Sequence, residues 1–199
     1  MSDQLPLGEI VDHILDFRGR TPAKLGMEWG GGNIRALSAN NVKDGWIDFE
    51  KECYLGGEDL YAAWMTRGDC EKGDIVFTME APMGNVAQIS DNKKYILSQR
   101  VVLLSPKKDL VNGNYLYHFM RGTDFRSQCE ELATGTTAKG IKQKNLTLVN
   151  ISLPPLPEQK KIAEILSGID SAIQAGMGMK SKIYKQYQGI VCDIFSGNS

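Results

Sequence analysis

The sequence predicts an α+β protein in which a mixed, partly barrel-like β domain with short helices is followed by a long C-terminal coiled-coil helix. Short runs rich in β-branched and aromatic residues, bounded by glycines and turn dipeptides, recur through residues 33–104 and indicate strands. After residue 153, three prolines introduce a stretch whose apolar residues recur every three or four positions, which indicates a helix. We therefore expect one domain over residues 1–152 and a second over residues 153–199.

The first segments are a short strand or turn around residues 7–14 and a basic, glycine-punctuated run at 16–24. Glycine and proline in this run favour a turn with exposed amides and side chains, which could hold phosphate. Strand-like runs follow at 33–38 and 46–49, and the turn dipeptide Asp44-Gly45 between them predicts a hairpin. Residues 58–64 are a candidate short helix with Leu60, Ala63 and Trp64 on one face.

The middle of the chain is the most β-rich region. Residues 74–79 and 84–89 alternate apolar and polar, and 101–104 form a continuous apolar run typical of a buried strand. Residues 114–126 carry aromatic side chains at helical spacing, which predicts a core helix rather than a base-stacking platform. A polar turn at 134–137 precedes a lysine-rich segment, and 146–153 predicts a closing strand.

The C-terminal stretch predicts a helix roughly 50 Å long at 1.5 Å per residue. Pro157 is suited to the first turn, where Glu158 meets the positive end of the helix dipole. Glycines within the stretch weaken an isolated helix by about 1 kcal/mol each, so the helix needs a partner. Its heptad seam, broken by one glycine and one lysine, comprises Ile162, Leu166, Ile169, Ile173, Gly176, Lys180, Ile183, Tyr187, Ile190 and Ile194.

The two imperfect positions of this seam distinguish parallel from antiparallel pairing of two copies. In an antiparallel pair with Ile162 opposite Ile194, Gly176 lies opposite Lys180, so the lysine stem fills the space that glycine leaves. A parallel pair leaves a void at Gly176 and brings two Lys180 ammonium groups together. An antiparallel homodimer is the better solution. The alternative is an amphipathic helix folded back on its own domain.

Composition and charge bound the function. A net charge of -1 does not by itself indicate nucleic-acid binding, although phosphate contact needs only a local basic patch. The four cysteines are scattered and only two histidines accompany them, so we expect reduced thiols and no metal site. No apolar run reaches membrane-spanning length and no secretory signal is recognisable, so we expect a soluble, cytoplasmic protein without membrane association.

Motifs for catalysis and cofactor binding are missing from the sequence. It contains no phosphate-binding P-loop, no GxGxxG after a strand, no GxSxG nucleophile elbow and no HExxH. Acidic residues beside the strands, such as Asp74, are more often solvated than catalytic. We therefore expect a binding protein with no cofactor, not an enzyme.

Several motifs occur together in the order of a known family. They are FRGRTP at 17–22, GDIVFTMEAPMGNVAQ at 73–88, the pattern from TGTT to ISL over 134–153, LPPLPEQKKIAEILSGID at 153–170, and IVCDIFSG at 190–197. With these motifs the chain resembles the specificity (S) subunit of type I restriction-modification enzymes. Such subunits commonly carry two target-recognition domains and two conserved helices, whereas this chain has one of each and resembles a half subunit.

The resemblance implies a non-catalytic subunit that directs the methyltransferase (M) and restriction (R) subunits to double-stranded DNA. Residues 1–152 would read half of a bipartite target, and the helix would space the readers and dock the M subunit. Two antiparallel copies would then replace the usual two-domain subunit and require an inverted-repeat target. Other hypotheses are a structural or regulatory dimerisation protein that reads no DNA, and a fragment of a nuclease or methyltransferase.

Candidate DNA contacts are exposed polar residues on turns. Lysines without acidic neighbours can neutralise phosphates, whereas arginine, asparagine and glutamine can read purine edges. Each candidate could equally be an ordinary solvated loop residue, and for Thr21 and Thr136 a turn-forming role is favoured. The candidates are Arg18, Arg20, Thr21, Lys24, Asn40, Asn41, Gln99, Arg100, Thr136, Thr137, Lys139, Lys142 and Lys144, with the three lysines after residue 138 as first choices for the DNA backbone.

Overall fold

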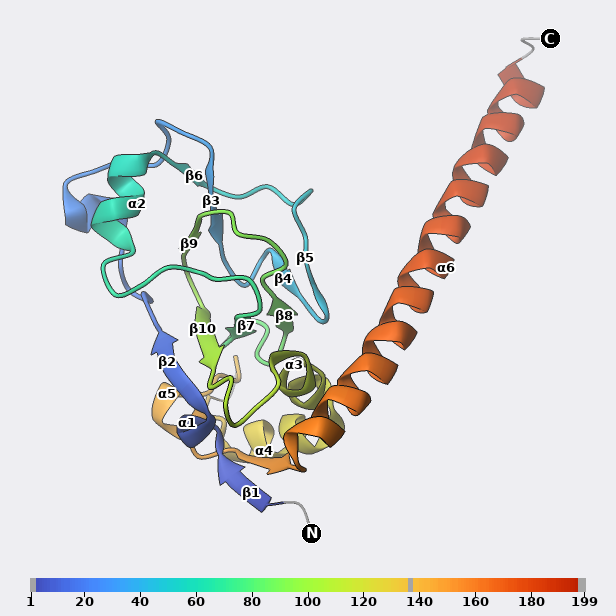
Figure 1. The fold of residues 1–199 in the computed structure, drawn as a ribbon. Coiled ribbons are helices and arrows are strands. Elements are labelled where there is room, and N and C mark those ends of the chain that lie inside the picture. The colour runs from blue at the N-terminus through green and yellow to red at the C-terminus, as the bar shows by residue number, and fades with distance from the viewer. Residues whose placement is uncertain (1–2, 136–137, 197–199) are drawn as a thin grey trace. The chain divides into compact units, whose positions relative to one another are not determined.

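The computed structural model describes residues 3–135 and 138–196, although beyond residue 176 only some side chains are described. The chain divides into two compact units, Met1–Lys160 and Lys161–Ser199. The first contains every described strand and the short helices, and the second is the body of one long helix (Figure 1). The predicted α+β class with a C-terminal helix is confirmed.

The chain begins with strand β1 (Asp3–Pro6), the single-turn helix α1 (Leu7–Ile10) and strand β2 (Val11–Leu15). The prediction of a strand or turn over 7–14 is therefore correct only from residue 11. Leu7 and Ile10 are fully buried on one side of α1, and the Leu7 amide donates to the Val149 carbonyl (2.8 Å). This tertiary contact holds a helical turn that local propensity alone does not specify.

Strand β3 (Ile34–Leu37) is the centre of a three-stranded sheet. It pairs antiparallel with β6 (Leu55–Gly56) and parallel with β9 (Tyr95–Leu97). The predicted hairpin between 33–38 and 46–49 is wrong, because the Asp44-Gly45 turn joins two shorter strands, β4 (Val42–Lys43) and β5 (Trp46–Ile47). A turn dipeptide connects only its immediate neighbours, while β3, mostly buried, requires partners on both sides.

A four-stranded antiparallel sheet has the order β2-β10-β7-β8. Its inner strands are β7 (Ile75–Thr78) and β10 (Val101–Pro106), and β8 (Val86–Gln88) forms one edge. The predicted buried strand at 101–104 is confirmed. The alternation expected over 74–79 is not seen, because all four residues of β7 are buried. Thr78 stays satisfied there by accepting from the Asn85 amide (2.9 Å).

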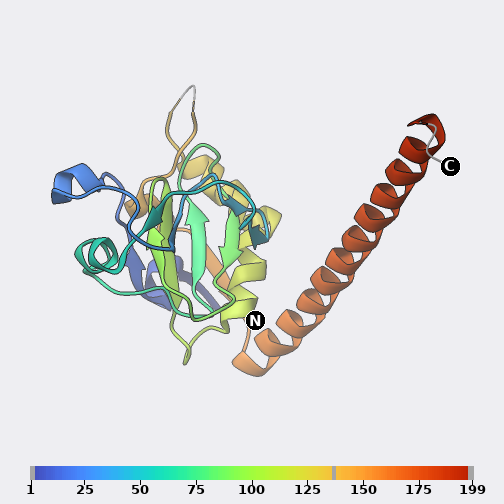
Figure 2. The same cartoon turned by 90° about the horizontal axis from the view of Figure 1, so that it is seen from above.

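Two helices cover one side of this sheet, α3 (Gly113–Arg121) and α4 (Thr123–Leu132), as Figure 2 shows. The single helix predicted over 114–126 is interrupted at Gly122, whose backbone is extended. Its predicted core role is confirmed, since Tyr115, Leu116 and Met120 are buried. Phe125 on α4 meets Phe77 of β7 edge to face, with ring centroids 5.9 Å apart.

The remaining short elements complete the first unit. They are the 3-10 helix η1 (Pro22–Leu25), helix α2 (Glu58–Trp64), helix α5 (Gln143–Leu146) and strand β11 (Asn150–Leu153). The predicted helix 58–64 coincides with α2, and the predicted strand 146–153 shortens to β11, which pairs with β1. The described strands form four sheets, none of which closes into a barrel.

Helix α6 (Leu156–Ser196) begins at Leu156, directly after Pro154 and Pro155 and one residue before Pro157, where the start was predicted. Its first turn is anchored by Gln159, which is 1% exposed. The Gln159 amide accepts from the Asn112 backbone amide (2.8 Å) and donates to the carbonyls of Leu110 (3.2 Å) and Pro154 (2.8 Å). Among the described residues, no helix is long and apolar enough to cross a membrane.

Candidate nucleic-acid interface

Three adjoining hollows in the first unit bring together residues from well-separated segments of the chain. The first and second, of about 730 and 340 Å³, share Ser38, Asn40 and Gln99. The third, of about 230 Å³, adjoins the second where Glu80 Oε1 lies 3.8 Å from Arg100 Nε. We call the three together the polar groove. Its polar lining includes Arg18, Ser38, Asn40, Lys43, Glu50, Lys51, Glu52, Glu80, Ser98, Gln99, Arg100, Thr134, Lys142 and Gln143.

Five of the residues that the sequence predicts as DNA contacts line this groove. They lie after β2, between β3 and β4, between β9 and β10, and just before α5. Only the folded sheets bring these connections together. The five are Arg18, Asn40, Gln99, Arg100 and Lys142.

Two residues of the second hollow have backbone angles that glycine normally adopts. The φ angle is 45° at Ala81 and 66° at Arg100, and no other non-glycine residue in the described part of the chain has a positive φ. Such conformations cost on the order of 1 kcal/mol and concentrate at functional sites. This strain supports a functional role for the groove independently of residue type.

The β4–β5 turn is fixed firmly beside the groove. Asp44 Oδ1 pairs with Arg126 Nη2 (2.7 Å), and the Tyr117 hydroxyl donates to the Gly45 carbonyl (2.7 Å). Lys43, which precedes this turn, lines the second hollow and donates to the Asn40 carbonyl (2.7 Å). The turn therefore places a cation in the groove that residue type and spacing alone did not identify.

Arg18 is held in the third hollow by Asp16. Its Nε and Nη2 atoms donate to the carboxylate at 2.6–3.0 Å. Burial alone would raise the pKa of Asp16, but the Arg18 hydrogen bonds outweigh it and lower that pKa. The same hydrogen bonds raise the pKa of Arg18, so the guanidinium stays charged and oriented. Its Nη1 has no partner among the described residues.

Three other predicted contacts do not line the groove. Arg20 donates from Nη1 to the Trp64 carbonyl, and Lys24 Nζ donates to the Gly19 carbonyl (2.6 Å). Thr21 Oγ1 accepts from the Lys24 amide (3.3 Å) and caps η1, which agrees with its favoured turn-forming role. These contacts hold the turn in place.

Asn41 is 2% exposed, which corrects its prediction as a base-reading residue. Its Oδ1 accepts from the Ser38 hydroxyl (3.1 Å) and its Nδ2 donates to the Lys51 carbonyl (3.3 Å). A side chain occupied and buried in this way cannot face a base. It braces the loop that presents its exposed neighbour Asn40.

Four predicted contacts remain, all between residues 136 and 144 of the sequence. Thr136 and Thr137 lie outside the described residues. Lys139 and Lys144 are exposed and flank Lys142 in sequence, but neither lines the groove itself. They could contact a ligand only beyond its edge.

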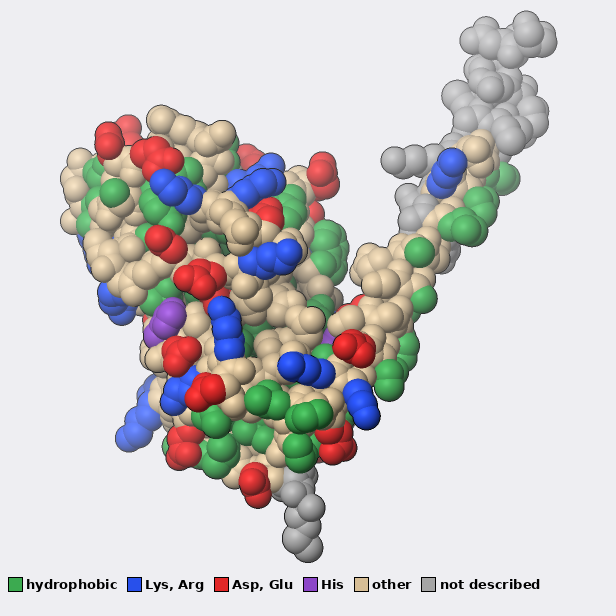
Figure 3. All heavy atoms as spheres, in the orientation of Figure 1, with side chains coloured by type: hydrophobic (Ala, Val, Ile, Leu, Met, Phe, Trp, Pro, Cys, Tyr) green, Lys and Arg blue, Asp and Glu red, His purple; other side chains and the backbone are tan. Residues whose placement is uncertain are grey.

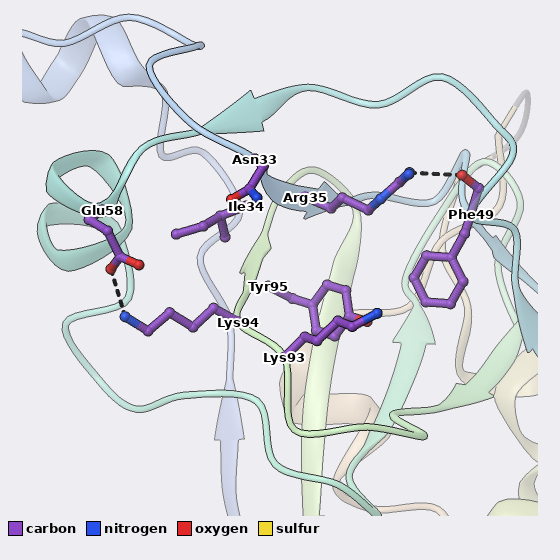
Figure 4. A pocket seen from close by; sticks show the side chains of 8 residues that line it. All are labelled: Asn33, Ile34, Arg35, Phe49, Glu58, Lys93, Lys94 and Tyr95. Carbon is purple, nitrogen blue, oxygen red and sulfur yellow. Dashed lines mark hydrogen bonds and ion pairs between the residues drawn. The ribbon is translucent and has the colours of Figure 1, made fainter.

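A separate hollow of about 560 Å³ lies beside β3 and β9 (Figure 4). Its basic side chains are already engaged: Lys94 Nζ pairs with Glu58 (2.6 Å), and Arg35 Nη1 donates to the Phe49 carbonyl (2.8 Å). Lys93 Nζ also lies 3.5 Å from Asp91 Oδ2. No sequence-predicted DNA contact lines this hollow, so we place the candidate interface at the polar groove.

Basic residues outnumber acidic ones at one end of the groove, in its second and third hollows. Over the face shown in Figure 3, basic and acidic side chains are intermixed and form no broad single-sign surface. In the second and third hollows, however, one acidic residue, Glu80, accompanies four basic ones. This local excess can hold a polyanion despite the net charge of -1. The four are Arg18, Lys43, Arg100 and Lys142.

Comparison with known families identifies the fold to which this groove belongs. The family described as "Type I restriction modification DNA specificity domain" matches residues 3–183. The chain belongs to this family. The expected resemblance to specificity subunits is thereby confirmed.

Curated relatives in the specificity-domain family are longer proteins. The chain is 29% identical over 169 residues to the specificity subunit of the type I restriction enzyme MjaVIII of Methanocaldococcus jannaschii, a match that covers 82% of this chain and 39% of the relative. It is 36% identical over 73 residues to the EcoKI specificity subunit of Escherichia coli, covering 35% and 16% respectively. The chain therefore spans less than half the length of these relatives.

Solved structures of the family share the fold. The S subunit of the type I system of M. genitalium superposes with a TM-score of 0.64 at 15% identity, covering 100% of this chain and 47% of that one. The HsdS subunit of Thermoanaerobacter tengcongensis gives 0.62 at 16% identity, covering 94% and 47%. One α+β unit and one helix of this chain thus correspond to about half of each subunit.

Proposed function

We propose that the chain is a non-catalytic DNA-specificity subunit whose polar groove reads half of a bipartite double-stranded target and whose helix assembles it with methyltransferase and restriction subunits. The groove's second and third hollows carry the proposal, because predicted DNA contacts converge there with both strained non-glycine residues. The division into a reading domain over 1–152 and a helix over 153–199 follows from this assignment.

The reading roles divide by side-chain chemistry. Arg18 and Arg100 can donate to guanine edges, and Asn40 and Gln99 can bond adenine edges in the major groove. Lys142 inside the groove, with Lys139 and Lys144 at its margin, would neutralise phosphates. Arg20, Thr21 and Lys24 would support the Arg18 turn rather than contact bases.

The helix supports an antiparallel coiled-coil homodimer. Large apolar side chains of its described seam are exposed to solvent. The exposed fraction is 52% at Ile169, 49% at Ile173 and 59% at Ile183. Such a stripe in water calls for a partner helix. The side chains of Lys180, Ile190 and Ile194 lie outside the described residues, so those layers rest on the sequence. Pairing two copies would place two readers a fixed distance apart.

Selection from a random double-stranded DNA pool tests this function. The full chain, alone and with its methyltransferase partner, should enrich an inverted repeat with a constant spacer. Enrichment of one asymmetric half-site would reject the two-fold arrangement. If no sequence is enriched in either preparation, the DNA-reading role is rejected and a dimerisation protein that reads no DNA becomes the better hypothesis.

Replacing Lys139, Lys142 and Lys144 together by alanine should weaken binding to all DNA sequences alike. Each lysine that contacts a phosphate contributes about one unit to the slope of log affinity against log salt concentration, so the slope should flatten. Binding titrations at several salt concentrations measure both effects. Replacing Lys107, Lys108 and Lys160 by alanine removes the same charge from surfaces that do not line the groove, and an equal loss there would argue against a local patch.

Relief of the strained backbone should separate stability from binding. Arg100→Gly should raise the free energy of unfolding by up to about 1 kcal/mol while weakening DNA binding, because it removes both the strain and a donor. Ala81→Gly relieves the same type of strain without removing a polar group, so it should stabilise the protein with little loss of affinity. Urea unfolding and DNA titration check the pair. Equal affinity of the Arg100→Gly variant and the wild type would remove Arg100 from the interface.

A further inference from the structure

Glu80 is an acidic side chain in the most basic part of the polar groove. Its carboxylate is half exposed and lines the third hollow with Arg18 and Lys142. Its ion pair with Arg100, at 3.8 Å, is longer than a hydrogen bond. No described residue donates a hydrogen bond to this carboxylate, so both oxygens remain able to accept from a ligand.

The backbone around Glu80 is held by its neighbours, and the side chain takes no part in holding it. The Met79 amide donates to the Arg100 carbonyl (2.8 Å), and the Ile141 amide donates to the Met79 carbonyl (3.0 Å). Glu80 itself forms a bridge with Gly140, where an added Cβ would lie 3.1 Å from Glu80 Cβ. Glu80 is thus presented from a backbone that hydrogen bonds hold in place, and its carboxylate interacts with the described part of the fold through the long ion pair with Arg100 and the nearby charge of Arg18.

The chemistry of DNA restricts what such a carboxylate can face. A phosphate would repel it, and the acceptor atoms of guanine and thymine in the major groove would do the same. Cytosine presents its 4-amino group as a donor. Adenine also presents an amino group, but its N7 acceptor lies beside it and opposes a carboxylate.

Resting on the proposed DNA-reading function, we infer that Glu80 and Arg100 together read one C·G base pair in each half-site. Glu80 accepts from the cytosine 4-amino group, and Arg100 donates to guanine O6 and N7. The pair presents an acceptor beside donors, which complements the donor beside acceptors on the major-groove edge of C·G. The long Glu80–Arg100 separation leaves each group free to make its contact.

The test combines base analogues with Glu80 variants in the full chain. In the selected target, each cytosine is replaced in turn by 2-pyrimidinone, which lacks the 4-amino group. At one position per half-site the wild type should lose about 10- to 100-fold in affinity, whereas Glu80→Ala should bind both DNAs equally. Glu80→Gln should move the selected base at that position from cytosine toward adenine, since a glutamine amide can bond adenine N6 and N7. Glu9→Gln, on α1, is the matched charge control and should behave as wild type.

Contrary outcomes are distinct. If Glu80→Gln selects the same sequence and binds every DNA more tightly, Glu80 faces phosphate or solvent and the inference is overturned while DNA reading stands. The inference is overturned in the same way if wild type and Glu80→Ala respond alike to every base analogue. If the wild type enriches no sequence at all, the proposed function and this inference fall together.

Discussion

Gln159→Leu is expected to destabilise the first unit by about 3 kcal/mol or more. The substitution removes three hydrogen bonds and leaves three partly buried groups, the Asn112 amide and the carbonyls of Leu110 and Pro154, without these partners. Each such loss costs about 1–3 kcal/mol, and a domain has only about 5–15 kcal/mol in total. Urea unfolding of the full chain measures the change. Gln174→Leu, at an exposed position of α6, is the matched control and should stay within about 0.5 kcal/mol of wild type.

A glutamate at the same position refines this test. Gln159→Glu keeps an acceptor for the Asn112 amide but sets a carboxylate against two carbonyl oxygens, which raises its folded-state pKa. Its stability deficit relative to wild type should therefore shrink as pH falls, since a protonated carboxyl can donate to one carbonyl. If the Gln159→Leu variant has the same free energy of unfolding as wild type, the hydrogen bonds of Gln159 do not contribute to stability, and the PLPEQ sequence at 155–159 has no anchoring role.

Local signals in the sequence were sufficient for several elements. The proline-to-helix transition at 156, the apolar run of β10 and the short helix α2 each depend on residues within one turn or strand. Strand pairing was less predictable, because β3 finds β6 and β9 at long range and in opposite senses. The Asp44-Gly45 signal was real but belonged to a hairpin too short to show as alternation.

The residue types of the candidate interface could be predicted from the sequence, but which of these residues come together in the folded chain could not. Arg18, Asn40 and Arg100 could be selected as exposed polar residues on turns, yet nothing local separates Asn40 from the buried Asn41. Burial of Asn41 follows from its bond to the Lys51 carbonyl, ten residues away. Glu80 was missed because an acidic residue does not look like a DNA contact. The signal was its place between the end of β7 and the Ala81-Pro82 turn.

Ile173→Asp is expected to raise the dissociation constant of the proposed homodimer by about 1000-fold. In the antiparallel register Ile173 faces Ile183 of the partner copy, and the two-fold axis places the substitution in the interface twice. Two carboxylates would be buried without partners, at about 2 kcal/mol or more each. Sedimentation at several concentrations measures the change. Gln174→Asp puts the same charge on an adjacent, non-seam position and should leave the dimer intact.

The double variant Ile173→Asp with Ile183→Lys decides the direction of the pair. In an antiparallel dimer each new aspartate faces a new lysine, so part of the lost affinity should return and should fall again as salt is added. In a parallel dimer aspartate faces aspartate and lysine faces lysine, so the double variant should associate no better than the single one. Recovery would also restore selection of an inverted repeat, because the spacing of two readers depends on the same contact. If the Ile173→Asp variant still dimerises, Ile173 does not lie in the dimer contact. If in addition the double variant is monomeric, the dimer contact lies elsewhere on the chain.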